Sequence, residues 1–245
     1  MMWSGHPWRP FPLTGLAAPN WSRPRPAMRW SPRPRVRAMS TELILVRHGQ
    51  TDWNVEGRYQ GQAGPGLNER GRRQALEAAR KLAGTPVEAV YTSDLPRAFE
   101  TARIIADVLG APVYPDERLR ELHQGVWQGM LFSDIQTRYA EALRNFREDP
   151  VHHSPPGGET VAQLARRITN ALDDIASRHP GKRVVVVTHK LPIAIIRSMV
   201  AGNPPHEVWN AIPENAQAII VSWPLQTASA RQPDAWLAGG DQARN

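Results

Sequence analysis

From residue 41 onward, short apolar runs alternate with longer amphipathic segments along the chain. The apolar runs predict β-strands because they are short, rich in β-branched residues and bounded by polar ones, and they lie at 43–46, 87–91, 113–114, 183–188 and 218–222. The amphipathic segments predict helices at 69–83, 96–109, 135–146, 160–178 and 192–201. Strands separated by helices predict an α/β fold: a three-layer α/β/α sandwich with a mainly parallel central sheet and helices on both faces.

The helix predicted at 160–178 has the clearest pattern, because Val161, Leu164, Ile168, Leu172 and Ile175 share one face. The stretch 119–127 has no period of its own, so we expect an irregular segment there. The chain therefore divides into three predicted parts. These are an irregular extension rich in Arg, Pro and Trp at 1–40, a globular domain at 41–225, and a loosely ordered tail at 226–245.

The positive charge of the chain is confined to the first of these parts. The formal net charge is +7, from 30 Lys and Arg against 23 Asp and Glu. Residues 1–40 hold seven arginines and no acidic residue, which leaves 23 basic and 23 acidic residues in the remainder. A basic arm for nucleic acid or lipid and an organelle transit peptide are two readings of 1–40. We favour a third, in which translation begins at Met39, and we expect no nucleic-acid partner.

Composition excludes several other classes. The chain has no cysteine, which rules out a disulfide framework, a thiolate zinc site and a cysteine nucleophile. The longest apolar run, near 184–187, is far shorter than the roughly 20 residues that span a bilayer. We therefore expect a soluble cytoplasmic protein with no membrane partner. His152 and His153 are expected in a solvated loop rather than at a metal.

Polar residues that can bind an anion follow three of the predicted strands. Arg47 and His48 follow the first strand, Arg97 begins the helix after the second, and His189 follows the fourth. In parallel sheets such positions meet at the carboxyl edge. Arginine binds two phosphate oxygens at once and keeps its charge, so this group of cations predicts a phosphate site.

A histidine at the centre of a phosphate site suggests covalent chemistry, because imidazole is a nucleophile at neutral pH. Such a step also needs a proton donor for the leaving oxygen, which a carboxylic acid can supply. Glu121, in the irregular segment, is the best candidate for this acid.

Five blocks of sequence carry a family resemblance and occur in the family's order: LVRHGQTDWN (45–54), TSDLPRA (92–98), LRE (119–121), GGET (157–160) and VTH (187–189). Together they resemble the histidine phosphatase superfamily, in the branch shared with cofactor-dependent phosphoglycerate mutases. The chain is most similar to the compact broad-specificity and α-ribazole phosphatases of that branch.

The resemblance implies a role for each matched residue. His48 would become a phosphohistidine, and Glu121 would donate and then accept a proton. Arg47, Arg97 and His189 would hold the phosphoryl oxygens, with a further polar contact from Asn54. Gln50, Thr51, Gln60 and Gly61 would line the mouth of the site. The resemblance implies no metal and no cofactor, and a small-molecule phosphate ester as the partner; a homo-oligomer is compatible with it.

Two positions depart from the family pattern: Lys190 stands where glycine is frequent, and Gln128 where glutamate is frequent. We expect the Lys190 side chain to point to solvent rather than add charge to the pocket. Arg72, Arg73, Arg166 and Arg167 are expected on solvated helix faces. Trp53 and Trp127 are equally compatible with packing and with substrate contact.

The covalent step serves both hydrolysis and transfer between hydroxyl groups. Mutases of the family carry extra segments between the acid and the second histidine, and this chain is compact there, which favours a phosphomonoester hydrolase. The alternative is a phosphoglycerate mutase that works through 2,3-bisphosphoglycerate. A phosphate-binding protein without catalysis is a third class, disfavoured because every predicted catalytic residue is present. The loops at 125–158 and 203–215 are expected to select the substrate.

Overall fold

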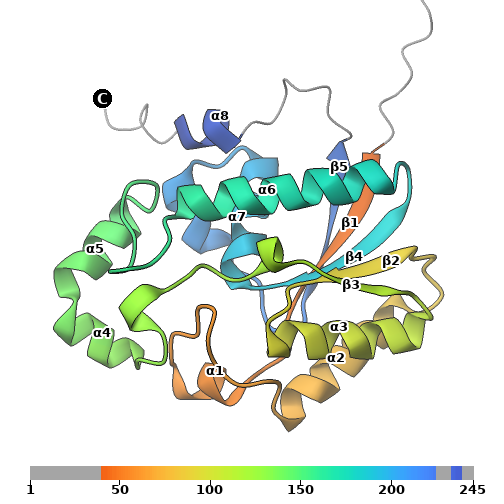
Figure 1. Ribbon diagram of the computed structural model, residues 1–245, viewed down its shortest axis with the longest axis horizontal. Coiled ribbons are helices and arrows are strands. Elements are labelled where there is room, and N and C mark those ends of the chain that lie inside the picture. Colours follow the sequence, from red (N-terminus) through yellow and green to blue (C-terminus); the bar gives the residue numbers. More distant parts are fainter. Residues whose placement is uncertain (1–39, 225–232, 239–245) are drawn as a thin grey trace, which may run out of the picture. The chain divides into compact units, whose positions relative to one another are not determined.

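The computed structural model describes residues 40–224 and 233–238. The predicted extension, apart from Ser40, lies outside the described residues, as does most of the predicted tail. The five strands are β1 (Ser40–Arg47), β2 (Ala89–Thr92), β3 (Val113–Pro115), β4 (Arg183–Thr188) and β5 (Ala218–Pro224). They form one sheet in the order β3-β2-β4-β1-β5, shown in Figure 1.

The sheet is mainly parallel, as predicted. β1 and β2 each pair in parallel with β4, β3 pairs in parallel with β2, and β5 runs antiparallel to β1 at one edge. The register sets Val46 opposite Val187 and Arg47 opposite Thr188, so β1 and β4 end side by side. This alignment brings the residues after both strands to one edge of the sheet.

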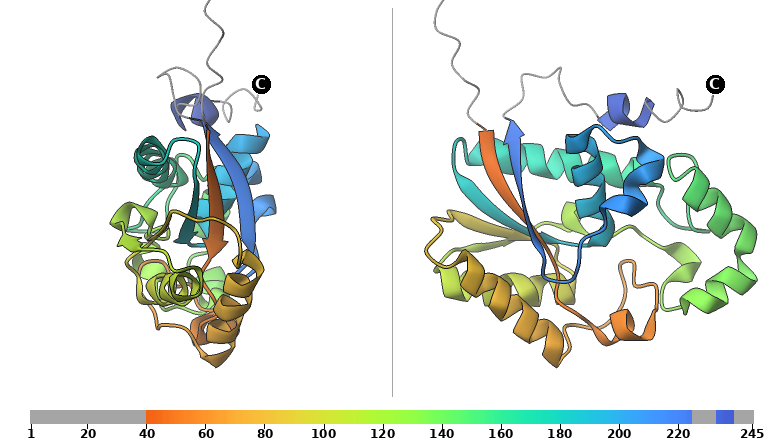
Figure 2. Two further views of the ribbon diagram at one scale, coloured as in Figure 1. Left: turned by 90° about the vertical axis from the view of Figure 1, so that its right-hand side faces the viewer. Right: turned by 180° about the vertical axis from the view of Figure 1, so that it is seen from behind.

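Helices lie on both sides of the sheet (Figure 2), which confirms the predicted layers. Alternate residues of β1 point to opposite faces, as a pleated strand requires. Ile44 and Val46 pack with α2 (Glu69–Leu82) and α3 (Pro96–Leu109). Leu43 and Leu45 pack with α6 (Val161–Arg178) and α7 (Lys190–Ala201).

A second apolar cluster, separate from the two sheet faces, lies beside the carboxyl edge. It is built around Trp127, Leu143 and Phe146 and draws on α4 (Phe132–Arg138), α5 (Ala140–Glu148), and two 3-10 helices, η2 (Gly125–Trp127) and η3 (Pro205–Ala211). A third 3-10 helix, η1 (Glu117–Leu119), precedes Glu121. This cluster supports the loops that surround the strand ends.

The structure differs from the local expectations at three places. The single helix predicted at 135–146 is two helices, because Tyr139 leaves helical geometry while its ring packs edge-on against Trp127. The five-residue helix α1 (Asp52–Glu56) was not predicted, since it is too short to show a period. Within the predicted tail, α8 (Pro233–Ala238) is helical, and Trp236 donates a hydrogen bond to the Asn203 carbonyl. No helix in the described part of the chain is long and apolar enough to cross a membrane.

Candidate active site

The two predicted histidines meet at the carboxyl edge of the sheet. The backbone N–H of His48 donates to the Thr188 carbonyl at 3.0 Å, which ties the end of β1 to the end of β4. His189 follows directly and is the residue before α7. The centroids of the two imidazole rings are 5.1 Å apart. The register of the parallel strands therefore produces the histidine pair.

The hydrogen bond of His48 fixes which nitrogen can react. Its Nδ1 lies 2.7 Å from the Gly49 carbonyl oxygen, which can only accept, so Nδ1 carries the proton. The other nitrogen, Nε2, then holds a free lone pair. Burial, with Arg97 and Arg47 adding positive charge, lowers the pKa of His48 well below its ordinary value. The imidazole is neutral and nucleophilic at neutral pH.

His189 is fully buried beside Ser93, a residue that follows β2. Its Nε2 lies 2.8 Å from the Ser93 hydroxyl, while its Nδ1 has no hydrogen-bond partner among the described residues. Burial first, then the charge of Arg97, lowers the pKa of His189 well below its ordinary value. A buried nitrogen without a partner is costly, and a substrate oxygen could supply that partner.

Arg97 is held by backbone carbonyls. Arg97 is 1% exposed and donates to Ala63 at 2.8 Å and to Gly61 at 2.6 Å. Burial lowers the pKa of Arg97 to about 10, so the guanidinium stays charged at neutral pH.

Arg47 is anchored in a similar way, by a hydrogen bond to the Pro213 carbonyl at 2.8 Å. The Nε atoms of Arg47 and Arg97 are both buried without a partner in the described part of the chain. Neither guanidinium is in an ion pair with a carboxylate of the described residues. Both arginines thus keep positive charge available for an anion.

Glu121, the residue predicted to be the acid, lies near these cations. It is 8% exposed, and the charges of Arg47 and Arg97 both interact with it. Its Oε1 accepts from the Leu122 backbone at 2.8 Å, and its Oε2 accepts from the Leu191 backbone at 3.4 Å. These two bonds orient the carboxylate against the start of α7.

A single pocket of about 620 Å³ unites most of the predicted residues. Those that line it are Arg47, His48, Asn54, Gln60, Gly61, Arg97 and Glu121. Gln50 and Thr51 are not among its lining residues. The Gln50 side chain accepts from Asn68 instead, and Thr51 caps α1. His189 is fully buried beside His48 and is not among the lining residues.

Asn54 takes part in the capping box of α1, where its Oδ1 accepts from the Thr51 backbone at 3.1 Å. Its amide NH2 is the group that remains to donate into the pocket. Asn215, which sequence reasoning missed, donates to the His48 carbonyl at 3.0 Å and to the Asn54 Oδ1 at 3.4 Å. Asn215 precedes β5 in a loop with no motif, so no sequence signal marked it.

The outer wall of the pocket is both apolar and basic. It comprises Leu143, Phe146, Arg147, Lys190, Trp209 and Ile212. The expectation that Lys190 would point to solvent rather than to the pocket was wrong: the residue is exposed and also lines the pocket. Burial, opposed by the charge of Glu121 and assisted by those of Arg47 and Arg147, lowers the pKa of Lys190. The expected substrate-selecting loops thus reach the pocket through this wall.

The remaining predictions concern two tryptophans, the helix arginines and a metal site. Trp127 is fully buried in the second apolar cluster, whereas Trp53 lines the pocket. Arg166 is exposed as expected, but Arg167 was wrongly assigned to solvent, because its side chain is only 21% exposed. Among residues 40–224 and 233–238, no group of three or more His, Asp or Glu side chains could hold a metal ion.

The carboxyl edge of the sheet holds a neutral buried imidazole, two arginines free to bind an anion, and an oriented carboxylate. This combination defines a phosphoryl-transfer enzyme. The chain belongs to the histidine phosphatase superfamily (branch 1), whose family model matches residues 43–232.

Known proteins place the chain within this family. It is 34% identical over 180 residues to phosphoserine phosphatase 1 of Hydrogenobacter thermophilus, covering 74% of this chain and 85% of that protein. It is 33% identical over 207 residues to a probable phosphoglycerate mutase, GpmB, of Yersinia enterocolitica, covering 81% and 89%. Among solved structures, the alpha-ribazole phosphatase of Shigella flexneri superposes with a TM-score of 0.66 at 26% identity, over 74% and 90% of the two chains. The chain is a phosphatase of this family, and mutases are among its relatives.

Proposed function

We propose that the protein hydrolyses small phosphomonoesters in two steps through a phosphohistidine on His48. The observation that supports this most directly is the Nδ1 hydrogen bond to Gly49, because it leaves the Nε2 lone pair free. Arg47 and Arg97 supply positive charge at the pocket without a metal ion. We also propose a cytoplasmic location, which cell fractionation would check.

In the first step, Nε2 of His48 attacks phosphorus and the bond from phosphorus to the leaving oxygen breaks. Glu121 gives its proton to that oxygen, so an alcohol departs rather than an alkoxide. Arg47, Arg97 and His189 stabilise the charge on the phosphoryl oxygens. In the second step, the Glu121 carboxylate takes a proton from water, whose oxygen bonds to phosphorus as the phosphorus–nitrogen bond breaks. Inorganic phosphate leaves, and Nε2 regains its lone pair.

Replacement of the nucleophile tests this mechanism. His48→Ala should lower kcat on p-nitrophenyl phosphate by at least about 10³-fold, because no covalent step remains. The same variant should lose the acid-labile phosphoenzyme that the wild-type protein forms. His152→Ala removes an exposed histidine and is the matched control. Turnover by His48→Ala near the wild-type rate would refute the assignment, and loss of wild-type activity in EDTA would refute metal independence.

We further propose that the leaving group carries its own negative charge. Lys190 and Arg147 both line the pocket and place positive charge in its outer wall. The similarity to a phosphoserine phosphatase supports a phosphorylated acid of this size. Phosphoserine should therefore have a higher kcat/KM than phosphoethanolamine, which lacks the carboxylate. Lys190→Ala should shrink that preference, whereas Lys182→Ala, at an exposed position, should keep it.

Hydrolysis is preferred over mutase activity because solvent reaches the pocket wall. Lys190 and Arg147 are both exposed while lining the pocket, so water has access to a phosphoenzyme. A mutase must exclude water at that stage. Incubation with 3-phosphoglycerate, with and without 2,3-bisphosphoglycerate, should release phosphate faster than it produces the 2-phospho isomer. Faster isomerisation would overturn the preference.

A further inference from the structure

The segment that carries Glu121 has no regular secondary structure to hold it. Glu121 lies between η1, which ends at Leu119, and η2, which begins at Gly125. Backbone groups of a helix or strand are fixed by their own ladder, but those of this segment need other partners. Side chains or backbone groups from other segments must therefore hold Glu121 in place.

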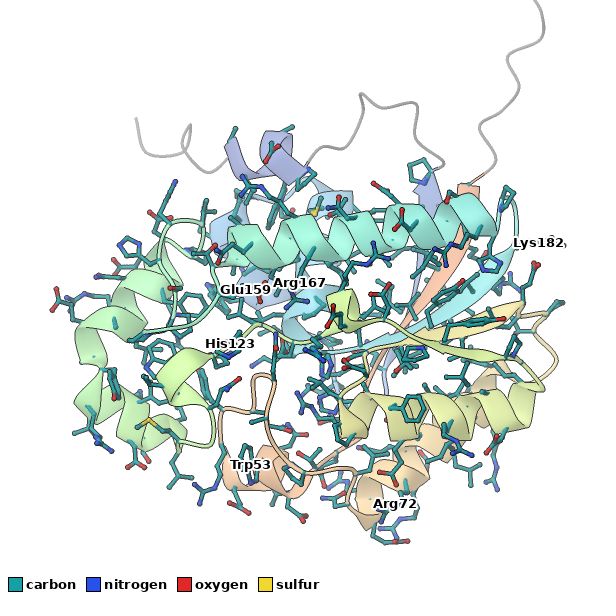
Figure 3. The ribbon with its side chains drawn as sticks, viewed as in Figure 1. Trp53, Arg72, His123, Glu159, Arg167 and Lys182 are labelled. Atoms are coloured by element: carbon teal, nitrogen blue, oxygen red, sulfur yellow. The ribbon has the colours of Figure 1, made fainter. Side chains whose placement is uncertain are left out.

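Arg167, on α6, supplies several of those partners, and Figure 3 shows it near Glu159 and His123. Its Nη1 donates to the carbonyls of Arg118 at 2.8 Å and Arg120 at 2.6 Å, and its Nη2 donates to the Glu121 carbonyl at 2.8 Å. Its Nε and Nη2 donate to the two carboxylate oxygens of Glu159 at 2.7 and 2.8 Å. A guanidinium has five N–H donors, and all five are used here.

Glu159 belongs to the GGET block, to which the proposed mechanism gives no step. Its Oε2 accepts from the His123 backbone N–H at 3.2 Å, and its own N–H donates to the His123 carbonyl at 2.9 Å. The Val126 N–H donates to the Pro156 carbonyl at 3.0 Å. The loop before α6 is therefore paired directly with the segment that follows Glu121.

Two glycines allow this close pairing. A Cβ on Gly158 would lie 2.5 Å from the His123 carbonyl oxygen, and one on Gly125 would lie 2.0 Å from that of Pro156. Both distances are shorter than a carbon atom tolerates, so only glycine permits the contact. Gly158 of the GGET block, like Gly125, is thus explained by contact between two backbones.

We propose that Arg167 and Glu159 form a clamp that positions Glu121 for proton transfer. Arg167 is a positioning residue, since it binds the backbone of the segment rather than the substrate. A lysine at this position keeps the charge but offers three donors from a single nitrogen, too few to repeat five bonds in a planar fork. This proposal rests on the function proposed above, in which Glu121 protonates the leaving oxygen.

The dependence of rate on the leaving group distinguishes positioning of the acid from a general structural role. Nitrophenolate leaves readily without a proton, whereas the alkoxide of phosphoserine does not. In a two-step mechanism kcat/KM reports only the steps up to formation of the phosphoenzyme. A displaced Glu121 should therefore lower kcat/KM for phosphoserine much more than for p-nitrophenyl phosphate.

The test compares Arg167→Lys with Arg166→Lys. Arg166 is the adjacent residue on the same helix, is 56% exposed and pairs with Asp234. Arg167→Lys should lower kcat/KM for phosphoserine about 10- to 100-fold, within the range of a general acid, and that for p-nitrophenyl phosphate by less than about threefold. Glu159→Gln should also lower kcat/KM for phosphoserine more than that for p-nitrophenyl phosphate. The difference should be smaller than in Arg167→Lys, because glutamine removes the ion pair and keeps the shape. Arg166→Lys should leave both values unchanged.

Circular dichroism and thermal melting establish that each variant is folded. Equal losses on both substrates, or no loss, in a folded Arg167→Lys protein would overturn the clamp. If that variant does not fold, Glu159→Gln decides the question by the same ratio. Failure of the proposed function has a different signature, because the wild-type protein would then form no phosphoenzyme and His48→Ala would stay active.

Discussion

At the scale of single residues, the site depends on histidines that stay neutral. His48 and His189 are both buried and lie near Arg97, and both effects disfavour an added proton. The resulting low pKa of His48 keeps its Nε2 unprotonated at neutral pH, as the proposed nucleophile requires. The same property makes folding sensitive to acid.

The pH dependence of stability follows from these lowered pKa values. Below about pH 6.5, the unfolded chain binds protons at both histidines that the folded protein does not, so the free energy of unfolding falls as pH falls. The stability that each neutral histidine contributes is fully present above pH 6.5. Below that pH, the free energy of unfolding falls by up to about 1.4 kcal/mol per pH unit for each histidine. The free energy of unfolding, measured in urea, should fall between pH 7.5 and pH 5.5 in both proteins. The fall should be about 1 kcal/mol smaller in His189→Gln than in the wild-type protein.

The exposed His152 provides the control for this experiment. His152→Gln should reproduce the pH dependence of the wild-type protein within error. An identical loss in His189→Gln and wild type would show that His189 protonates as readily folded as unfolded.

At the scale of elements, the loop after β1 is held against the first turn of α2. A Cβ on Gly71 would lie 2.1 Å from the Gln50 carbonyl oxygen, and one on Gly49 would lie 2.4 Å from that of Gly71. The Gly49 N–H also donates to Thr101 on α3 at 3.1 Å. Two helices thereby fix the loop whose Gly49 carbonyl accepts the hydrogen bond from His48 Nδ1.

The prediction at this scale is that Gly71→Ala is destabilising, although alanine favours helices over glycine by about 1 kcal/mol. The new methyl group must displace the Gln50 backbone, and overpacking of this kind costs about 1–3 kcal/mol. Thermal melting should show a lower Tm, and kcat/KM should fall because the His48 loop moves. Arg73→Ala, at an exposed position on the same helix, should leave both unchanged. A higher Tm for Gly71→Ala would contradict this account.

At the scale of the whole molecule, the net charge of +7 does not describe the catalytic domain. The described sheet begins at Ser40, and the residues from 41 onward carry equal numbers of acidic and basic groups. The positive charge that concerns catalysis is local and lies with the arginines of the pocket. The arginines of 1–40 precede the catalytic domain in the sequence and lie outside the described residues.

A chain that begins at Met39 should therefore retain the activity and stability of the full chain. We expect kcat/KM on p-nitrophenyl phosphate within about twofold and an unchanged Tm, because β1 and its partners remain complete. Binding of the full chain to nucleic acid, measured at rising salt, should be weak and should vanish in the shorter chain. Loss of activity on truncation would show that 1–40 belongs to the working enzyme.

Most of the fold was predictable because its signals are local. Periods of two and of about 3.6 residues marked the strands and the long helices, and α6 matches its prediction closely. The helix α1 was not predicted because five residues are too few to show a period. The break at Tyr139 was not predicted because the apolar spacing continues through it.

The chain by itself determined which residue types follow each strand, and parallel pairing then required Arg47, His48, Arg97 and His189 to share an edge. Only the tertiary structure decided that Lys190 lines the pocket and that Asn215 reaches the His48 backbone. It also separated Arg167 from Arg166, two neighbours alike in the sequence. The reason is physical: a side chain's burial and partners are set by segments far away in the chain, and local periodicity does not encode them.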